Sequence, residues 1–478
     1  MGMADPVPIA VEPPERPGPP WGLVAVLAVG LVLRVALLFP AAGYEPQIED
    51  EQHYRQIATT VVRHGEYGFE PGQPTSIRPP LYPFLVAAVW KVTGTESLQA
   101  VRVVQIVLSL ANVVLVYLLG LRLFNRRVAL LAAAGLCFYP SLVFYDYLLL
   151  TEVLFTFLLT LTALGYVHLL DRERAWIAFA TGGALGLAAL TRSVMWPFPT
   201  LLAPLAFASV GGPFLKRLRV AALLLVGFAL VVGPWVARNT RLQGVFTVVD
   251  TMGGLNLHMG NYEHTLHERT WATIGLTGDK HWAVPLRQEH PDASTWSEGR
   301  KEKWAQKRAL GFMIAHPGLT LRRSAIKFAD FWGLEREIIA GFAKGLYDAP
   351  RWFVGLATVA IAVSFPLVLG LAIVGIFRAA PLDRRAHAFL LLVVLFMCGL
   401  HTLAFGHSRY HLPLVPILLV YAAACVAARG RLLPEPAEGR LRAALAPALT
   451  AAVMLAIWVR EVLVTDLHRI QELFRGLG

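Results

Sequence analysis

A short acidic segment and an arginine that follows it are the first residues whose types and spacing could do chemistry. Residues 49–54 read EDEQHY and residues 76–83 read SIRPPLYP, and apolar stretches flank both. Carboxylates are costly beside a bilayer, so an acidic cluster at its edge is a functional hypothesis. A carboxylate that takes a proton and an arginine that holds a phosphate predict chemistry on a lipid-linked substrate.

The acidic segment contains a candidate general base, Asp50. Asp50 and Tyr54 are four residues apart, so on a helix they share a face. Partial burial at a membrane surface raises the pKa of a carboxyl, which helps it to accept a proton. The alternative is that Glu49, Asp50 and Glu51 only cap the N-terminus of a helix. The triplet by itself favours capping, so the case for a base depends on the other residues.

Three arginines are candidate ligands for an anionic headgroup. Arg78 precedes two prolines, which stiffen the backbone and then start a helix. Arg409 lies in a loop between two predicted spans, and Arg192 lies on the outer side of the predicted topology, against the usual bias. A guanidinium stays charged and binds phosphate through a planar fork. The alternatives are snorkelling to the interface for Arg78 and stabilisation of a helix end for Arg409.

Glu152 precedes an apolar run that continues almost unbroken to Leu170. An ionisable residue in that position should face the interior of the bundle or a cavity. Asp146, a little earlier, is interpreted as a loop residue. The histidines, including the pair His264 and His267, do not have the spacing of a metal site. We therefore expect that no cofactor is required, and nothing in the sequence supports a divalent metal.

The composition is that of a polytopic helical membrane protein. Of the 478 residues, 56% are hydrophobic and 16% are charged, and the mean hydropathy is +0.55. Soluble proteins carry roughly a quarter charged residues. The three cysteines all lie in apolar runs, which excludes a disulfide framework. The net charge of +11 comes from short basic clusters between apolar segments, which is the positive-inside pattern and not that of a nucleic-acid surface.

These basic clusters orient about eleven predicted membrane-spanning helices. If each cluster is cytoplasmic, the spans alternate consistently. The short apolar stretch 80–94 is the exception, and we interpret it as an interfacial helix, with a short true span as the alternative. The predicted spans are 21–40, 98–121, 128–145, 147–170, 175–191, 194–210, 220–237, 351–377, 387–405, 410–428 and 443–460.

The predicted fold is therefore all-α, with interfacial helices beside the membrane and a small periplasmic domain. Between Asp50 and His64 the apolar residues recur at helical spacing, which predicts an amphipathic helix. The predicted organisation is a disordered cytoplasmic N-terminus (1–20), an N-terminal transmembrane module (21–237) with a periplasmic catalytic loop (41–97), a periplasmic loop domain (238–350), C-terminal transmembrane helices (351–460) and a C-terminal tail (461–478).

Taken in order, these segments resemble the GT-C type glycosyltransferases, and most of all the branch that contains protein O-mannosyltransferases and bacterial aminoarabinose transferases. The similarity runs from about residue 20 to about residue 415. The motifs that carry it are Asp50-Glu51-x-x-Tyr54, Arg78-Pro79-Pro80-Leu81, Tyr139-Pro140 with Thr151-Glu152, Arg238-Asn239 with Gly244, Gly253-Gly254-x-Asn256 with Gly260-Asn261, and Arg409-Tyr410-x-x-Pro413.

The resemblance implies a reaction. An acceptor group attacks the anomeric carbon of a sugar carried on a polyprenyl monophosphate, the phosphate leaves, and the anomeric configuration inverts. The motifs assign the catalytic role to Asp50, as general base, and to its neighbour Glu51. The residues expected to hold the donor phosphate are Arg78, Arg409 and Arg192. The residues expected to contact the substrates are Tyr54, Tyr82, Glu152 and Tyr410.

The implied partners are a polyprenyl-phosphate-linked sugar donor, a lipid, glycan or protein acceptor, and the bilayer. The implied location is a bacterial inner membrane, with the active site facing the periplasm. Lysine often stands at the position of Arg78 in the aminoarabinose transferases, which weakens the case for lipid A as the acceptor. One alternative is a non-enzymatic assembly subunit. The other is a transporter or flippase for lipid-linked substrates, and such a transporter should show inverted repeats and broken midplane helices.

Overall fold

The computed structural model describes residues 20–379, 383–428 and 438–465, and most of these residues are helical. Within them, only one short hairpin of β1 (Gly68–Glu70) and β2 (Gln73–Pro74) forms a sheet. The all-α fold is therefore confirmed.

Two predictions fall largely on other residues. The disordered N-terminus expected over 1–20 lies outside the described residues except for Pro20. The expected C-terminal tail, 461–478, lies outside them beyond residue 465.

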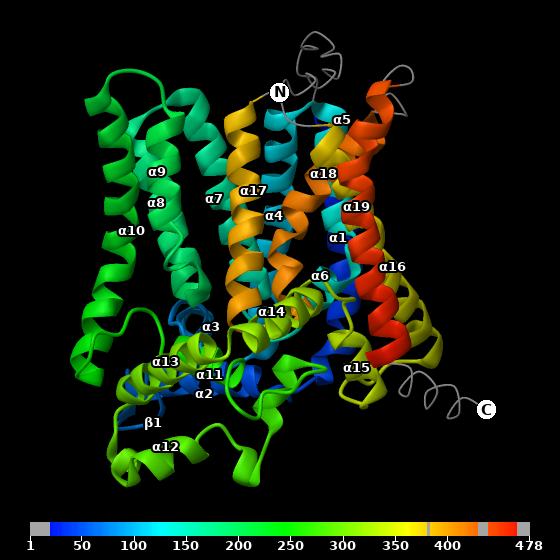
Figure 1. Ribbon diagram of the computed structural model, residues 1–478. Helices are drawn as coiled ribbons and strands as arrows, with labels where there is room; N and C mark the ends of the chain where they lie inside the picture. The colour runs from blue at the N-terminus through cyan, green and yellow to red at the C-terminus, as the bar shows by residue number, and fades with distance from the viewer. Residues whose placement is uncertain (1–19, 380–382, 429–437, 466–478) are drawn as a thin grey trace.

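Among the described residues, eight helices are long and apolar enough to cross a membrane. Figure 1 shows them running side by side as one bundle. Shorter apolar helices accompany them, namely α3 (Leu81–Thr93), α8 (Ala175–Thr191) and α9 (Pro199–Ser209). The eight are α1 (Trp21–Leu38), α4 (Leu98–Leu123), α7 (Glu152–Arg172), α10 (Phe214–Gln243), α16 (Arg351–Arg378), α17 (Arg384–Leu403), α18 (Val415–Ala427) with the preceding turn η6 (Ser408–Leu414), and α19 (Glu438–Arg460).

A proline divides the predicted span 128–145. Here α5 (Arg126–Cys137) ends before Tyr139, and α6 (Pro140–Tyr145) begins after it. Tyr139 has extended backbone angles, φ −69° and ψ 112°, because the residue before a proline avoids the helical conformation. The segment is therefore two short helices, neither of which reaches the roughly 30 Å thickness of a bilayer core.

Two further helices were expected at the interface, and both are present. The amphipathic helix predicted between Asp50 and His64 is α2 (Glu49–His64), which buries Tyr54, Ile57, Ala58 and Val61 and ends at Gly65 with φ 74°. The stretch 80–94 forms α3, whose 13 residues span only about 20 Å at 1.5 Å per residue. Its length therefore favours an interfacial helix over a full span.

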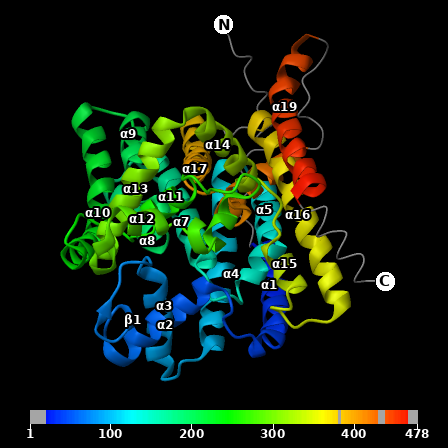
Figure 2. The ribbon, with the colours of Figure 1, turned by 60° about the horizontal axis from the view of Figure 1, so that its bottom comes forward.

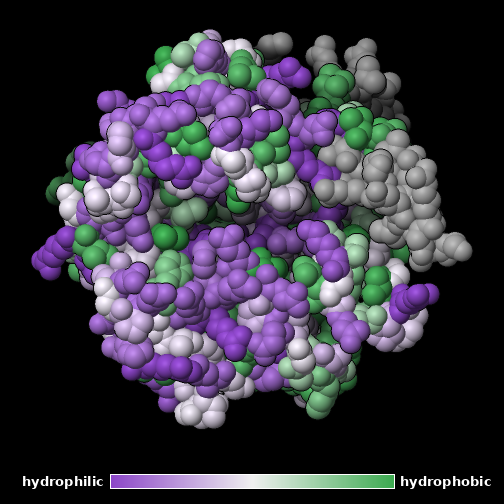
Figure 3. All heavy atoms as spheres, turned by 90° about the horizontal axis from the view of Figure 1, so that it is seen from below, coloured by the Kyte–Doolittle hydropathy of each residue, from purple (hydrophilic) through white to green (hydrophobic). Residues whose placement is uncertain are grey.

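The segment 238–350 gathers with α2 at one end of the bundle (Figures 1 and 2). The predicted boundary at 237 falls inside a helix, because α10 continues to Gln243. Seen from below in Figure 3, this end is mostly hydrophilic, with a hollow near its middle. The segment contains α11 (Gly253–Met259), α12 (Val284–Glu289), α13 (Glu298–Ala315), α14 (Pro317–Phe331) and α15 (Glu337–Ala343).

A buried ion pair ties α1 to the turn after α6. Arg34 is fully buried, and its Nε donates to Asp146 Oδ2 at 2.7 Å. Its other nitrogens donate to the carbonyl oxygen of Cys137 at 3.0 Å and to Ser109 Oγ at 3.1 Å. Asp146 does lie in a turn, as expected, but it is the partner that an arginine inside an apolar helix requires and not a solvated loop residue.

Candidate functional site

The residues of the acidic triplet at the start of α2 have different surroundings, and Glu51 has a structural role. Glu51 is fully buried, and its Oε2 accepts from Tyr44 OH at 2.5 Å and from the backbone nitrogens of Gln47 and Ile48 at 3.2 Å. Its Oε1 accepts from the nitrogen of Leu149 at 2.8 Å. The capping interpretation therefore fits Glu51, whose carboxylate is satisfied by these donors and does not reach the arginines.

Asp50 points in another direction, toward two guanidinium groups. Its Oδ1 lies 2.7 Å from Arg78 Nη2, and its Oδ2 lies 3.3 Å from Arg409 Nη1. The side chain of Asp50 is 29% exposed, and that of Arg409 is 9% exposed. Residues 50, 78 and 409 are far apart in the chain, and the fold joins them at a partly open position.

Glu152 and Arg192 meet from the facing ends of two adjacent helices. Glu152 is the first residue of α7, and Arg192 follows the last residue of α8. Glu152 is fully buried and forms ion pairs with both Arg192 and Arg409 through its Oε1. Arg192 Nε also donates to Thr151 Oγ1 at 2.9 Å. Oε2 of Glu152 has no hydrogen-bond partner within the protein, so it is a buried acceptor open to another donor.

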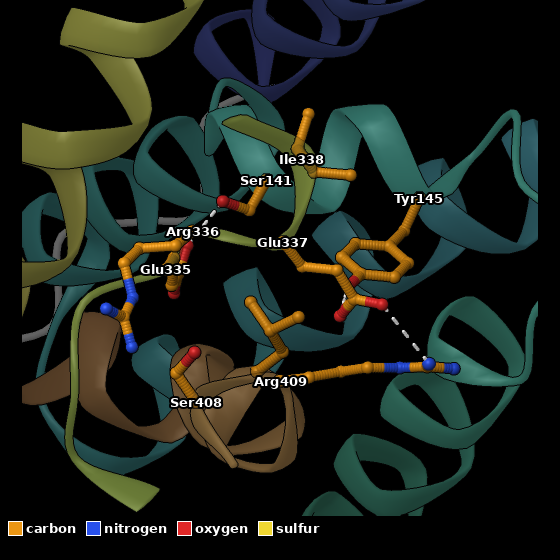
Figure 4. A pocket seen from close by; sticks show the side chains of 9 residues that line it. Ser141, Tyr145, Glu335, Arg336, Glu337, Ile338, Ser408 and Arg409 are labelled. Carbon is orange, nitrogen blue, oxygen red and sulfur yellow. Dashed lines mark hydrogen bonds and ion pairs between the residues drawn. The ribbon is translucent and has the colours of Figure 1, made fainter. Parts of the chain in front are cut away.

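A third carboxylate, Glu337, completes the cluster, and the sequence interpretation missed it. Its Oε1 lies 3.4 Å from Arg409 Nη1, and its Oε2 accepts from Tyr145 OH at 2.9 Å. Figure 4 shows Glu337 and Tyr145 beside a small cavity that Glu335 and Ser408 also line. The available signal was the charged triplet 335–337 shortly after the amphipathic helix α14, a segment that was interpreted as part of the outer domain.

Six side chains from six separate segments of the chain thus form one ion-pair cluster. The three arginines are matched by three carboxylates, and Arg409 contacts all three acids. We call this set the arginine–carboxylate cluster, which consists of Asp50, Arg78, Glu152, Arg192, Glu337 and Arg409.

The predicted aromatic contacts lie at different depths around this cluster. The guanidinium of Arg78 lies 5.7 Å from the ring centre of Tyr54, and that of Arg192 lies 6.0 Å from the ring centre of Tyr410. Tyr82 is fully buried behind Tyr54, and its hydroxyl donates to Gln105 at 2.7 Å. Tyr54 and Tyr410 therefore contact the cluster, whereas Tyr82 supports it from behind.

The electrostatics of the cluster separate Asp50 from Glu337. Burial raises the pKa of the Asp50 carboxyl, but the charges of Arg78 and Arg409 lower it more, so its net pKa is below the ordinary value. The expected rise was wrong because two guanidinium groups outweigh partial burial. At Glu337, burial is again the largest effect, and the single nearby charge of Arg409 does not cancel it, so the pKa is raised.

In the described residues, no group of three or more His, Cys, Asp or Glu side chains is arranged to hold a metal ion. The carboxylates of the cluster are oriented toward guanidinium groups. Guanidinium groups bind phosphate oxygens through paired hydrogen bonds. The cluster therefore has the chemistry of a site for an anion next to a carboxylate base.

Residues 77–237 match the family model described as dolichyl-phosphate-mannose-protein mannosyltransferase. No curated protein matches the sequence. The solved oligosaccharyltransferase of Archaeoglobus fulgidus, in complex with Zn and sulfate, is similar with a TM-score of 0.50 and 15% identity, over 92% of this chain and 52% of that chain. The resemblance to GT-C type glycosyltransferases is confirmed. This chain spans about half the length of that oligosaccharyltransferase.

Two more solved structures are similar at low identity. The apo form of the A. fulgidus enzyme has a TM-score of 0.50 at 14% identity, over 92% of this chain and 55% of that chain. ArnT from Cupriavidus metallidurans, bound to undecaprenyl phosphate, has a TM-score of 0.43 at 14% identity, over 87% of this chain and 79% of that chain. The segment that matches the family model contains Arg78, Glu152 and Arg192, so half of the arginine–carboxylate cluster lies within it.

Proposed function

We propose that this protein is an inverting glycosyltransferase that moves a sugar from a polyprenyl monophosphate donor to an acceptor at the outer face of a bacterial inner membrane. The observation that carries the proposal is the placement of Asp50 between the guanidinium groups of Arg78 and Arg409. A base and an anion site in contact are what this transfer needs. The acceptor is a lipid, a glycan or a protein.

Asp50 is the general base of the proposed reaction. The acceptor hydroxyl loses its proton to the Asp50 carboxylate as its oxygen attacks the anomeric carbon. When the donor phosphate takes over the guanidinium groups, Asp50 loses two of the charges that lower its pKa and becomes a stronger base. Donor binding and activation of the base are therefore linked. Glu51, already satisfied by its own hydrogen bonds, positions the start of α2.

The arginines stabilise the leaving phosphate. The bond between the anomeric carbon and the phosphate oxygen breaks, and the phosphate gains a negative charge. Arg78 and Arg409 are oriented toward the same carboxylate, so a phosphate at that position meets both without rearrangement of the backbone. Arg192 adds a third positive charge beside Glu152. A phosphate leaving group of low pKa needs no general acid.

Glu152 binds a hydroxyl of the sugar or of the acceptor. Its Oε2 is buried and lacks a partner within the protein, which costs free energy unless a ligand supplies a donor. The residue is at the start of α7, so its position is fixed by a long buried helix. Sugar hydroxyls are donors of the right kind for a single unpaired carboxylate oxygen.

The side of the membrane follows from the distribution of charge. At one end of the bundle, basic side chains pair with acidic side chains of neighbouring helices. Arg122 at the end of α4 pairs with Asp171 at the end of α7, and Lys216 near the start of α10 pairs with Glu173, directly after α7. The arginine–carboxylate cluster lies at the opposite ends of the helices. If the basic end is cytoplasmic, the cluster faces the periplasm.

The direct test compares Asp50→Asn with the matched control Glu49→Gln. Both changes remove one carboxylate from the first turn of α2, but the side chain of Glu49 is 74% exposed and pairs with His53, whereas Asp50 pairs with Arg78 and Arg409. We expect Asp50→Asn to lower sugar transfer by about 10²- to 10⁴-fold, the usual contribution of a general base. Glu49→Gln should retain transfer.

The measurement is transfer of radiolabelled sugar to envelope glycans and lipids, together with mass spectrometry of lipid-linked sugars in a deletion strain. Accumulation of one lipid-linked sugar and loss of one envelope sugar would identify both substrates. Near-normal turnover by Asp50→Asn would remove the base from the proposal. Substrate movement across liposome membranes without sugar transfer would favour a transporter.

A further inference from the structure

Glu337 occupies a position in the cluster that the proposed reaction leaves without a role. It is the first residue of α15, outside the membrane-spanning helices, and its side chain is 25% exposed. One carboxylate oxygen lies 3.4 Å from Arg409 Nη1, and the other accepts from Tyr145 OH at 2.9 Å. It is thus an internal anion on the same guanidinium that is proposed to bind phosphate.

Titratable groups act on Glu337 from several neighbouring elements. Arg409 comes from η6, and Tyr145 comes from α6. The carboxylates of Glu152 in α7 and Asp50 in α2 contribute repulsion, and Glu337 also interacts electrostatically with Tyr347. The neighbouring residues in the chain are committed to other partners, since Arg336 pairs with Glu461, and Glu335 accepts from Tyr139, Ser141 and His411. Arg409 is therefore the one cation in ion-pair contact with Glu337 among the described residues.

The charge of the cluster changes when a phosphate enters. Three arginines and three carboxylates sum to zero, so a phosphodiester leaves one uncompensated negative charge in a partly buried site. An uncompensated charge in such a site is costly, and the usual response is protonation of a nearby group. The group that responds is the carboxylate that has the least positive charge left beside it when Arg409 turns to the phosphate.

The three carboxylates are not equal in this respect. Asp50 gives up both of its arginine partners to the phosphate, but it starts from a lowered pKa and keeps the nearby charge of Arg192. Glu152 is fully buried against two arginines, and Arg192 remains with it when Arg409 binds phosphate. Glu337 has one arginine at the longest of these distances, and burial raises its pKa. Glu337 is therefore the carboxylate that accepts a proton most readily.

We propose that Glu337 takes up one proton from solvent when the donor phosphate binds, and that its carboxylic acid then donates a hydrogen bond to that phosphate. The inference rests on the proposed function, because it requires a phosphate on Arg409. Protonation restores the charge of the cluster to zero and converts a repelling anion into a donor. Donor affinity is thereby coupled to pH, and the pocket favours a singly charged phosphodiester over a diphosphate.

The test measures binding of a polyprenyl phosphate methyl ester to the purified protein between pH 5.5 and 8. This probe is a phosphodiester, so its own charge is constant over the range. Because a proton is taken up on binding, affinity must fall as pH rises. Where close to one proton is taken up, we expect the wild-type affinity to weaken by about tenfold for each unit of rising pH. Glu337→Gln keeps the shape of the side chain and should bind with nearly constant affinity.

Two controls isolate Glu337. Asp348→Asn makes the same charge change in the segment just after α15 and should keep the wild-type pH dependence. Asp250→Asn removes a buried carboxyl that acts on Arg78. Burial raises the pKa of Asp250 to about 6, and this variant should also keep the wild-type pH dependence. Calorimetry in buffers of different ionisation enthalpy counts the protons directly, and we expect close to one for the wild type and close to none for Glu337→Gln.

The outcomes separate the two proposals. Equal pH dependence in the wild type and Glu337→Gln would overturn the assignment of Glu337 and leave the proposed function standing. Absence of probe binding by the wild type at every pH would overturn the proposed function itself. If only Asp250→Asn lost the pH dependence, Asp250 would be the group that takes up the proton, and the role of Glu337 would be refuted.

Discussion

At the scale of single residues, neighbours of the same chemical type have different surroundings. Successive residues on a helix point about 100° apart, so Glu51 turns into the protein and Asp50 turns toward the arginines. Glu51 receives four hydrogen bonds, whereas Asp50 receives charge from Arg78 and Arg409. Capping and proton transfer were alternatives for the acidic triplet as a whole. The structure favours capping for Glu51, and we propose proton transfer for Asp50.

A pH dependence follows at this scale. Asp50 must be ionised to act as a base, and its pKa in the free protein is below the ordinary value. We therefore expect kcat/KM for the donor not to fall as the pH is lowered from 7.5 to 5, because kcat/KM reports the free enzyme. The measurement is initial-rate transfer at low donor concentration across this range. A decline with a midpoint near pH 6 would assign the base to a different group.

At the scale of elements, the pairing of α8 with α10 fixes Arg192. The two helices approach closely through glycines, since a Cβ at Gly182 would overlap the carbonyl oxygen of Leu224, and a Cβ at Gly227 would overlap that of Phe179. In a membrane the hydrophobic effect does not drive helices together, so their association depends on close packing, which small residues allow. The end of α8, and with it the guanidinium of Arg192, is positioned by this contact.

The glycine contact can be tested within α10. We expect Gly227→Ala to destabilise the protein by about 1–3 kcal/mol, the usual cost of overpacking. Gly233→Ala is the matched control, because a Cβ there meets nothing within 4 Å and alanine has the higher helix propensity. Thermal unfolding in detergent should show a lower midpoint for Gly227→Ala only. Equal midpoints would mean that the helices separate at no cost.

At the scale of the whole molecule, charge is segregated between the two ends of the bundle. The arginine–carboxylate cluster and α11 to α15 lie at one end, and the ion pairs Arg122–Asp171 and Lys216–Glu173 lie at the other. The six residues of the cluster are therefore gathered at a single end of the bundle. This arrangement also explains why the six cluster residues come from segments as distant as α2 and η6.

The orientation is testable with single cysteines in a background without Cys137, Cys398 and Cys425. We expect Gln288→Cys, exposed in α12, to react with a membrane-impermeant maleimide in spheroplasts. Gly211→Cys, at the basic end, should react only after permeabilisation, because the positive-inside rule puts that end in the cytoplasm. The reverse pattern would place the cluster on the cytoplasmic side and overturn the proposed location.

The sequence by itself determined the class of the fold and most of the chemical types in the cluster. Apolar runs are local signals, and their length alone decides whether a helix can cross a bilayer. Five of the six cluster residues were also identified from the sequence, because a charged residue beside a membrane span is costly and therefore conspicuous in the sequence. These are Asp50, Arg78, Glu152, Arg192 and Arg409.

Only the tertiary structure decided which charges meet. The membership of Glu337 depends on the fold of the segment before α15, where no local pattern separates a site residue from a solvated one. The burial of Asp146 against Arg34 and the lowered pKa of Asp50 likewise depend on partners more than 25 residues away. Electrostatic interactions are set by distance in space, and distance in space between remote segments is fixed by packing and not by local sequence.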